Sequence, residues 1–211
     1  METITRRARA RRPRAAELVR RLTAERERTA RLPGATVTGT PRIVRDRANW
    51  VRCLVDRDQV VERGLDGATA RRAITDEGRL IWMVQARGRR HAYHAIAADA
   101  EAAFAEADEA RERRRQIGRR RAEIRRLRRD VLLGRRRYFT TIDDARVAGL
   151  CELGIRGFLA RIGHSRRGGA SAFVLALASF LDRQPGYAMF AAHLRLERER
   201  ASAALDDGSG S

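Results

Sequence analysis

Arginine is the residue type in this sequence whose number and spacing could do chemistry. All 46 basic residues are arginines, and they face 27 acidic residues, which leaves a formal net charge of +19. Residues 1–33 carry a net +7 and residues 111–137 a net +11, so the rest of the chain is nearly neutral. A guanidinium group is planar and permanently charged, and it binds phosphate through parallel hydrogen bonds. The clustering therefore predicts a polyanionic partner, with nucleic acid first.

The predicted phosphate-binding arginines lie in four parts of the chain. The segment 111–137 supplies the largest group, namely Arg113, Arg114, Arg115, Arg119, Arg120, Arg121, Arg125, Arg126, Arg128, Arg129, Arg135, Arg136 and Arg137. The others are Arg11 and Arg12 near the N-terminus, Arg87, Arg89 and Arg90 in a predicted turn, and Arg156, Arg161, Arg166 and Arg167 near the C-terminus. If about 6–8 arginines meet phosphates, affinity should fall roughly 10³-fold or more between 50 and 200 mM salt. We favour DNA as the polymer, although arginine-rich helices also bind RNA.

Residues suited to catalysis or metal binding are few and poorly spaced. His91 and His94 fall on a predicted strand at a spacing that puts them on opposite faces, which suits one metal ion badly. The remaining cysteines and histidines, Cys53, Cys151, His164 and His193, show no paired metal-ligand spacing. Asp143 and Asp144 could suggest a nuclease, but helix N-capping explains two acids there more simply. We therefore expect no catalysis, no metal, no cofactor and no disulfide, as suits a cytoplasmic protein.

The N-terminal part is expected to combine a basic arm with a small β-rich unit. Residues 1–33 predict a partly disordered arm that contains a short helix from Ala15 to Leu32. Residues 35–98 predict the β-rich unit, with strands at 36–38, 43–44 and 50–55 and a short helix at 67–73. Residues 79–96 have the pattern of a β-hairpin, because Gly88 interrupts two β-prone runs.

A long helix is predicted next, over residues 99–134, with Asp99 as its N-cap. Its first half is acidic and its second half is rich in arginine, which suits the helix dipole, and Gly118 marks a weak point. Ile117, Ile124, Leu127 and Val131 form a narrow apolar seam. The seam must pack on a second helix, on a second copy or on the body of the chain, and we favour a homodimer through these four residues.

Residues 138–204 are expected to form a helical domain, and residues 205–211 a tail. Thr141 or Asp143 caps a helix to about Cys151, and further helices are expected at 155–162, 171–181 and 187–204. The helix 171–181 is expected to be buried, and Pro185-Gly186 to break the chain before the last helix. No internal repeat, secretory signal or membrane-length apolar run is evident. The fold class predicted is α+β and mostly helical.

The stretch 143–161 has the spacing of a known DNA-binding motif. Ala145, Gly149 and Ile155 match the small residue, turn glycine and buried aliphatic residue of that pattern. The stretch resembles the helix-turn-helix DNA-binding proteins over about 20 residues, and the resemblance implies that 155–162 is a recognition helix. The same stretch resembles a motif of uncharacterised prophage and mobile-element proteins. An ordinary helical hairpin with a glycine turn is the alternative explanation.

The hairpin 79–96 followed by a helix is similar in element order to the arm-binding domains of tyrosine integrases. That resemblance implies phosphate contacts from the turn arginines, and it carries no recombinase activity because no catalytic set follows. The sequence thus favours a cytoplasmic, non-catalytic nucleic-acid-binding protein, as a regulator or DNA-handling accessory factor of a prophage or mobile element. The alternatives are an assembly factor whose arginines contact acidic protein surfaces, such as a phage structural or scaffold component, and a nucleic-acid enzyme with an unrecognised site.

Overall fold

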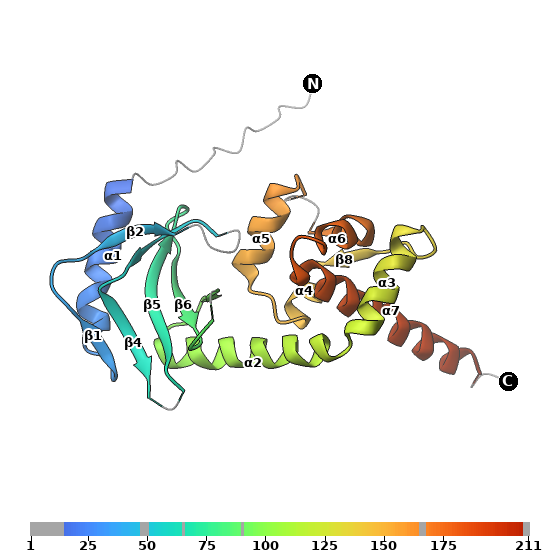
Figure 1. Ribbon diagram of the computed structural model, residues 1–211, viewed down its shortest axis with the longest axis horizontal. Coiled ribbons are helices and arrows are strands. Elements are labelled where there is room, and N and C mark those ends of the chain that lie inside the picture. The colour runs from blue at the N-terminus through green and yellow to red at the C-terminus, as the bar shows by residue number, and fades with distance from the viewer. Residues whose placement is uncertain (1–14, 47–50, 65, 90, 165–167, 209–211) are drawn as a thin grey trace, which may run out of the picture. The chain divides into compact units, whose positions relative to one another are not determined.

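The chain folds into two compact units, residues 1–92 and residues 93–211. The computed structural model describes residues 15–46, 51–64, 66–89, 91–164 and 168–208 (Figure 1). Of these residues, 51% lie in seven helices, and the strands pair in antiparallel fashion, so the predicted α+β, mostly helical class is confirmed. In the described part of the chain, no helix is both long and apolar enough to cross a membrane.

The first unit consists of one helix packed on an antiparallel sheet. Helix α1 (Ala15–Thr29) buries Leu18 and Leu22 against Leu54 and Ile74 of the sheet. The strands in chain order are β1 (Ala35–Val37), β2 (Ile43–Asp46), β3 (Cys53–Asp56), β4 (Gln59–Arg63), β5 (Ala68–Thr75) and β6 (Leu80–Gln85). The short helix predicted at Ala15–Leu32 is thus confirmed, and it belongs to the body of this unit.

Strand β5 is the centre of the sheet, and its two edges are paired differently. Strand β6 runs along one edge from Thr69 to Ile74. On the other edge, β4 pairs with the first part of β5 and β3 with its last part. Strands β3 and β4 are therefore two halves of one strand interrupted at residues 57–58. Strand β1 pairs with β4, and strand β2 pairs with β3. The outer strand is therefore interrupted as well, at residues 38–42.

Arg26 of α1 fills the place where both strands are interrupted. Its guanidinium group forms a 2.5 Å ion pair with Asp56, and it donates hydrogen bonds to the carbonyl oxygens of Thr38 and Gly39. The side chains of Arg26 and Asp56 are only 10% and 2% exposed. Because a buried charge is tolerated only when it is paired and hydrogen-bonded, this contact fixes α1 against the interrupted strands.

Two predictions for this unit need correction. The segment 67–73 was expected to form a short helix, but Ala68–Thr75 is the central strand β5. Alanine and arginine favour helices locally, yet neighbours on both edges of β5 bury Ala68, Ala70 and Ala73 and override that preference. Strand β4 was not expected. The predicted strand after Arg79 is confirmed as β6, and the return segment of the hairpin contains the short strand β7 (Tyr93–Ala95).

The second unit is mostly helical. After β7 it contains α2 (Ala100–Arg119), α3 (Arg121–Leu132), β8 (Phe139–Thr141), α4 (Ile142–Val147), α5 (Glu152–Arg161), β9 (Gly169–Ser171), α6 (Ala172–Ala178) and α7 (Arg183–Gly208). The core is formed by apolar side chains of α3 to α7, with Met189 and Phe190 of α7 fully buried at its centre. Asp99 caps α2 as predicted, because its carboxylate accepts a 2.8 Å hydrogen bond from the backbone N–H of Ala102.

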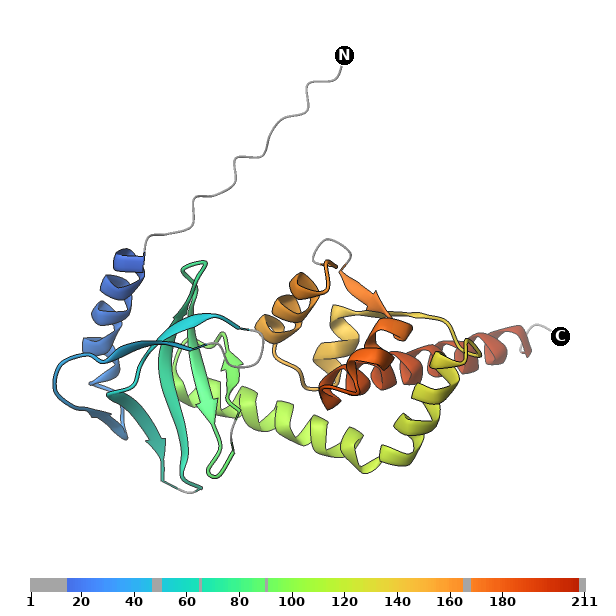
Figure 2. The ribbon, with the colours of Figure 1, turned by 45° about the horizontal axis from the view of Figure 1, so that its top comes forward.

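The predicted single helix over residues 99–134 is wrong, because the chain bends at Arg120. The N–H of Arg120 closes the last turn of α2 on the carbonyl of Ile117, and α3 then starts in a new direction (Figure 2). The bend allows Leu127 and Val131 to be buried in the core, with Ile117 and Ile124 packed beside them. The apolar seam therefore packs inside the unit, which leaves the predicted homodimer through these four residues without support.

The part of the chain after α3 contains two successive strand-helix-helix segments that the sequence did not reveal. β8-α4-α5 is followed at an offset of 30 residues by β9-α6-α7, and β8 pairs with β9 about Thr140 and Ala170. Two further hydrogen bonds obey the same local two-fold relation, from Ile142 N to Gly168 O and from Ala172 N to Tyr138 O. The segments share little sequence beyond a hydroxyl residue, Thr141 or Ser171, that ends each strand and caps the following helix, which is why the repeat was not evident.

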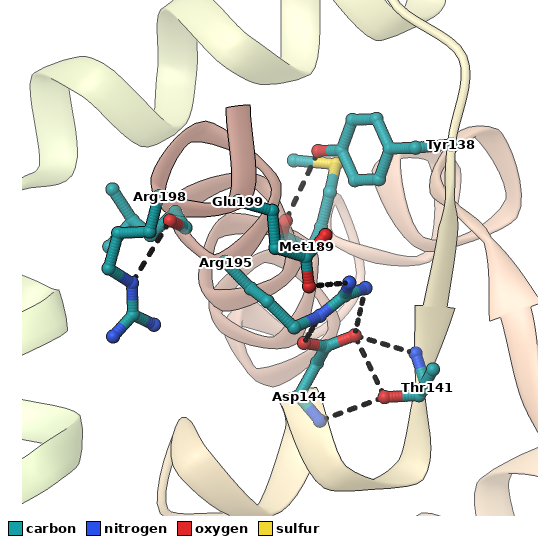
Figure 3. A network of polar contacts seen from close by, with 8 residues as sticks. Tyr138, Thr141, Asp144, Met189, Arg195, Arg198 and Glu199 are labelled. Atoms are coloured by element: carbon teal, nitrogen blue, oxygen red, sulfur yellow. Dashed lines mark hydrogen bonds and ion pairs between the residues drawn. The ribbon is translucent and has the colours of Figure 1, made fainter. Parts of the chain in front are cut away.

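A network centred on Asp144 joins α4 to α7 (Figure 3). The carboxylate of Asp144 accepts hydrogen bonds from the N–H and the hydroxyl of Thr141 and completes a capping box, so Thr141 is the N-cap of α4 as predicted. The same carboxylate accepts from Nε and Nη2 of Arg195, at 2.8 and 3.2 Å, and Arg195 also pairs with Glu199. Burial alone raises the pKa of Asp144, but the bonds from Arg195 and Thr141 outweigh it and hold this pKa below its usual value.

The last two helices differ from prediction in two ways. The sequence predicted a buried helix over 171–181, but α6 leaves Phe173 and Leu177 about half exposed. Pro185-Gly186 was expected to break the chain, yet α7 begins at Arg183 and includes both residues in its first turn. A proline is tolerated there because the first N–H groups of a helix have no partner within the helix. Asp182 supports the start of α7 by accepting a bond from the N–H of Gln184.

We predict that Arg26→Ala destabilises the first unit by about 3–5 kcal/mol, because it leaves the Asp56 carboxylate buried and unpaired. The change can be measured by urea unfolding followed by tryptophan fluorescence, since both tryptophans lie in this unit. Arg42→Ala is the matched control, because Arg42 is exposed and pairs with Asp58 on the surface. Its cost should stay below about 1 kcal/mol. Equal effects of the two substitutions would show that the buried pair does not hold α1.

We also predict that Asp144→Asn lowers the stability of the second unit at neutral pH by about 1–2 kcal/mol. The folded-state pKa of Asp144 is depressed, so its contribution is complete above the unfolded-state value of about 3.9 and is lost as pH falls through the folded-state pKa. Helical circular dichroism during urea unfolding at a series of pH values measures this. Wild type and Asp144→Asn should converge at acid pH, whereas the exposed neighbour variant Asp143→Asn should track the wild type throughout.

Candidate nucleic-acid interface

The structure describes only some of the predicted phosphate-binding arginines. Arg11, Arg12 and Arg90, together with Arg166 and Arg167 of the second unit, lie outside the described residues. Arg87 and Arg89 occupy the predicted turn after β6, where Gly88 has a φ of +70°. Both arginines are exposed there, and the turn is closed by a hydrogen bond from the N–H of Arg89 to the carbonyl of Ala86.

The arginines of α2 are largely neutralised by acids of the same helix. Arg113 pairs with Glu109, Arg115 with Glu112, and Arg111 with Asp108 at 2.7 Å. Each pair is separated by three or four residues, which places the partners side by side on the helix surface. The sequence contains this signal, since acids precede these arginines at helical spacing, but the prediction counted only the net charge. Arg119, in the last turn of α2, has no carboxylate partner among the described residues.

Arg113 and Arg114 also form hydrogen bonds to the end of α4 and to the turn that follows it. Arg114 donates to the carbonyl of Gly149 at 3.0 Å, and Arg113 donates to the carbonyl of Arg146 at 3.3 Å. These oxygens lie where the last carbonyls of a helix lack partners within the helix. Gly149 has a φ of +78°, and a Cβ there would lie 2.2 Å from the carbonyl oxygen of Ala110. Both arginines thus hold α2 against this turn.

Helix α3 carries a group of four arginines that are not paired with a carboxylate among the described residues. Arg121, Arg125, Arg126 and Arg128 have no carboxylate within ion-pair distance in the described part of the chain, and we call these four residues the α3 basic face. At 100° per residue they cover, with Arg129, about 160° of the helix circumference. This arc lies opposite Leu127 and Val131, which are buried in the core. Because Leu127 and Val131 pack into the core, the arginines on the other side of α3 point away from the core.

The arginines at the two ends of α3 are partly engaged. Arg120 pairs with Glu123, and its guanidinium carbon lies 4.8 Å from the centre of the Phe190 ring. Arg129 and Arg135 lie 4.0 and 3.7 Å from Asp130. Arg136 contacts His193 and Glu197, whereas Arg137 is exposed without a carboxylate partner among the described residues. Burial lowers the pKa of His193; Glu197 opposes this shift, and the charges of Arg136, Arg200 and Arg120 add to it.

The predicted recognition helix is α5, which begins at Glu152. The packing positions are as the motif requires, since Ala145 and Ile155 are buried and Gly149 forms the turn. The outer surface is balanced in charge, because Arg146 pairs with Asp143 and Glu152, and Arg156 pairs with Glu152. Arg161 is exposed at the end of α5. This surface therefore carries less unpaired positive charge than α3.

The groups considered for catalysis are placed apart or are buried. Asp144 is engaged by Thr141 and Arg195, whereas Asp143 is 82% exposed and paired with Arg146, so these carboxylates do not share a site. No group of three or more possible metal ligands occurs among the described residues. The sequence did not predict that the thiol of Cys151 lies 3.6 Å from Nδ1 of His94.

The two thiols are predicted to be unreactive in the folded protein. Burial raises the pKa of Cys53 to about 12, with smaller contributions from Asp46 and Asp76, and burial also raises the pKa of Cys151. Because the thiolate is the nucleophile, labelling by a disulfide reagent at about pH 8 should be slow for both and complete only in denaturant. Fast labelling of Cys151 without denaturant would instead indicate an activated cysteine beside His94.

Comparisons with known proteins identified no relative of this chain. No family model matches it, and neither the curated proteins nor the solved structures include a significant match.

Proposed function

We propose that this protein binds nucleic acid, with DNA favoured, and that the α3 basic face is the main phosphate-binding surface. The observation that carries the proposal is the contrast between two consecutive helices that are both rich in arginine. The arginines Arg111, Arg113 and Arg115 of α2 have carboxylate partners, whereas Arg121, Arg125 and Arg126 of α3 have none among the described residues. Unpaired guanidinium groups on a rigid helix can bind phosphates without first breaking an ion pair.

The arrangement supports sequence-independent binding more than base recognition. The charge-balanced surface of α5 offers Arg156 only in a pair with Glu152. Phosphate contacts position a protein on a polymer but carry no sequence information. We therefore infer an accessory or architectural role without catalysis, in the cytoplasm, and keep a prophage or mobile element as the proposed setting. Arg119 and Arg137 extend the unpaired cations beyond the two ends of α3.

The test compares two triple variants that remove the same charge. In the first, Arg121, Arg125 and Arg126 are changed to Gln, and in the control, Arg111, Arg113 and Arg115 are changed to Gln. Binding to labelled duplex DNA, duplex RNA and single strands is measured across a salt series. The first variant should reduce the slope of log K against log salt by about 3, because three phosphate contacts are lost. The control should change this slope by less than about 1.

Two outcomes contradict the proposal. If both triple variants reduce the slope equally, net charge alone governs binding and the α3 basic face has no special role. If the wild type binds every polymer weakly at about 150 mM salt and neither variant differs from it, the protein does not function by binding phosphates. Comparing the wild-type affinities for the three polymers tests the preference for DNA.

A further inference from the structure

Helix α6 is apolar around its whole circumference, but the unit covers only one side of it. Ala172, Leu175 and Ala176 are buried in the core. On another side, Phe173 and Leu177 lie four residues apart on one face of α6, and Phe180 follows in the turn after the helix; their exposed fractions are 50%, 49% and 62%. Leu181, directly after them, is 92% exposed. A helix with this composition normally has apolar neighbours on every side.

Two grooves between α6 and α3 extend this apolar side. One groove of about 380 Å³ is lined by Arg121, Ile124, Arg125 and Arg128 of α3 and by Phe180 and Leu181 after α6. The other, of about 530 Å³, is lined by Leu132, Leu133 and Phe173. The guanidinium carbon of Arg128 lies 4.3 Å from the centre of the Phe180 ring, so cations border the apolar surface directly.

We propose that this surface, formed by Phe173, Leu177, Phe180 and Leu181 and bordered by Arg121, Arg125 and Arg128, docks an acidic amphipathic helix of another protein. A groove lined by exposed apolar side chains is the geometry that receives the apolar face of such a helix. The unpaired arginines along one border select carboxylates on the edge of the partner. The docking surface shares Arg121, Arg125 and Arg128 with the α3 basic face, but its anchors are apolar side chains that phosphates do not contact, so it can be tested apart from nucleic-acid binding.

Charge argues against a second copy of the chain as the occupant. Two copies that met through this surface would bring the same arginines close to each other, and each chain already carries +19. Like charges that face each other across an interface disfavour association. An anionic membrane could attract the arginines, but a groove between two helices accommodates a convex helix better than a flat lipid surface.

The first test uses a designed peptide of about 20 residues, long enough to form a helix. It carries leucines along one face and glutamates beside them. Fluorescence anisotropy should show saturable binding at about 150 mM salt, and Leu177→Glu should weaken it by at least about tenfold. The matched control is Val147→Glu, which adds the same charge at an exposed apolar residue of α4. Circular dichroism and melting should confirm that both variants are folded.

Control peptides define the chemistry of the partner. A peptide with lysines in place of the glutamates, and a scrambled peptide of the same composition, should both bind at least about tenfold more weakly. Equal binding of the scrambled peptide would show that only net charge matters, and this result overturns the proposal. Absence of binding by the amphipathic peptide, or equal binding by wild type and Leu177→Glu, overturns it too.

The second test asks whether the surface is open in the free protein. Leu177→Cys should react rapidly with a disulfide reagent without denaturant, and bound peptide should slow the reaction, against the background of the buried Cys53 and Cys151. Slow labelling in the free protein would mean that the chain covers this surface itself. Self-association in sedimentation that Leu177→Glu abolishes, or Leu177-dependent binding to phosphatidylserine vesicles, would assign it to a second copy or a membrane. Each of these outcomes overturns the proposal.

The same variant separates this inference from the proposed function. Leu177→Glu should leave the salt dependence of DNA binding within about one unit of the wild-type slope, whereas the Arg121, Arg125 and Arg126 triple variant should reduce it. Loss of peptide binding with intact DNA binding supports the docking surface alone. If peptide binding persists in a protein that shows no salt-dependent DNA binding, the proposed function fails and the docking surface stands.

Discussion

The shortage of carboxylates is the constraint on which the rest of the structure depends. The chain has 46 arginines and 27 acidic residues, so many guanidinium groups cannot be paired within it. Buried arginines have carboxylate partners, as in the ion pair between Arg26 and Asp56 and that between Arg72 and Glu25. A buried guanidinium group without a partner would cost several kcal/mol, whereas an exposed one costs little. Arginines without a carboxylate partner are therefore found on the surface of the described chain, and four of them lie on α3.

Helix α3 has one apolar face, which packs into the core, and one basic face. Its buried side completes the core with Leu127 and Val131, while the α3 basic face points away from that core. The bend at Arg120 makes this possible, because it directs α3 into the core while α2 packs against the turn at Gly149. In the proposed arrangement, Arg121 and Arg125 serve both the phosphates and the edge of an acidic helix. Occupancy by one partner would then remove these residues from the other.

Secondary structure could be predicted from the sequence where local chemistry decides it. Asp99 and Thr141 are helix caps because each side chain accepts a hydrogen bond from the backbone N–H three residues ahead, and residues suited to such a cap can be recognised in the sequence. The strand β5 could not be predicted in this way. Its alanines and arginines favour a helix, and only the strands on its two edges make it extended. The break predicted at Pro185 was wrong for a related reason. A proline disrupts a helix only beyond its first turn, and Pro185 lies in the first turn of α7.

The sequence by itself determined the net charge, its concentration in two segments, the α+β class and the candidate arginines. It also contained the pairs on α2, whose partners are three or four residues apart. Only the tertiary structure decided which arginines remain unpaired, where the seam of Ile117 to Val131 packs, and that α6 keeps one apolar side uncovered. The physical reason is that ion pairs and burial depend on distances in space. Asp144 and Arg195 are 51 residues apart in the chain, and no local pattern indicates that they meet.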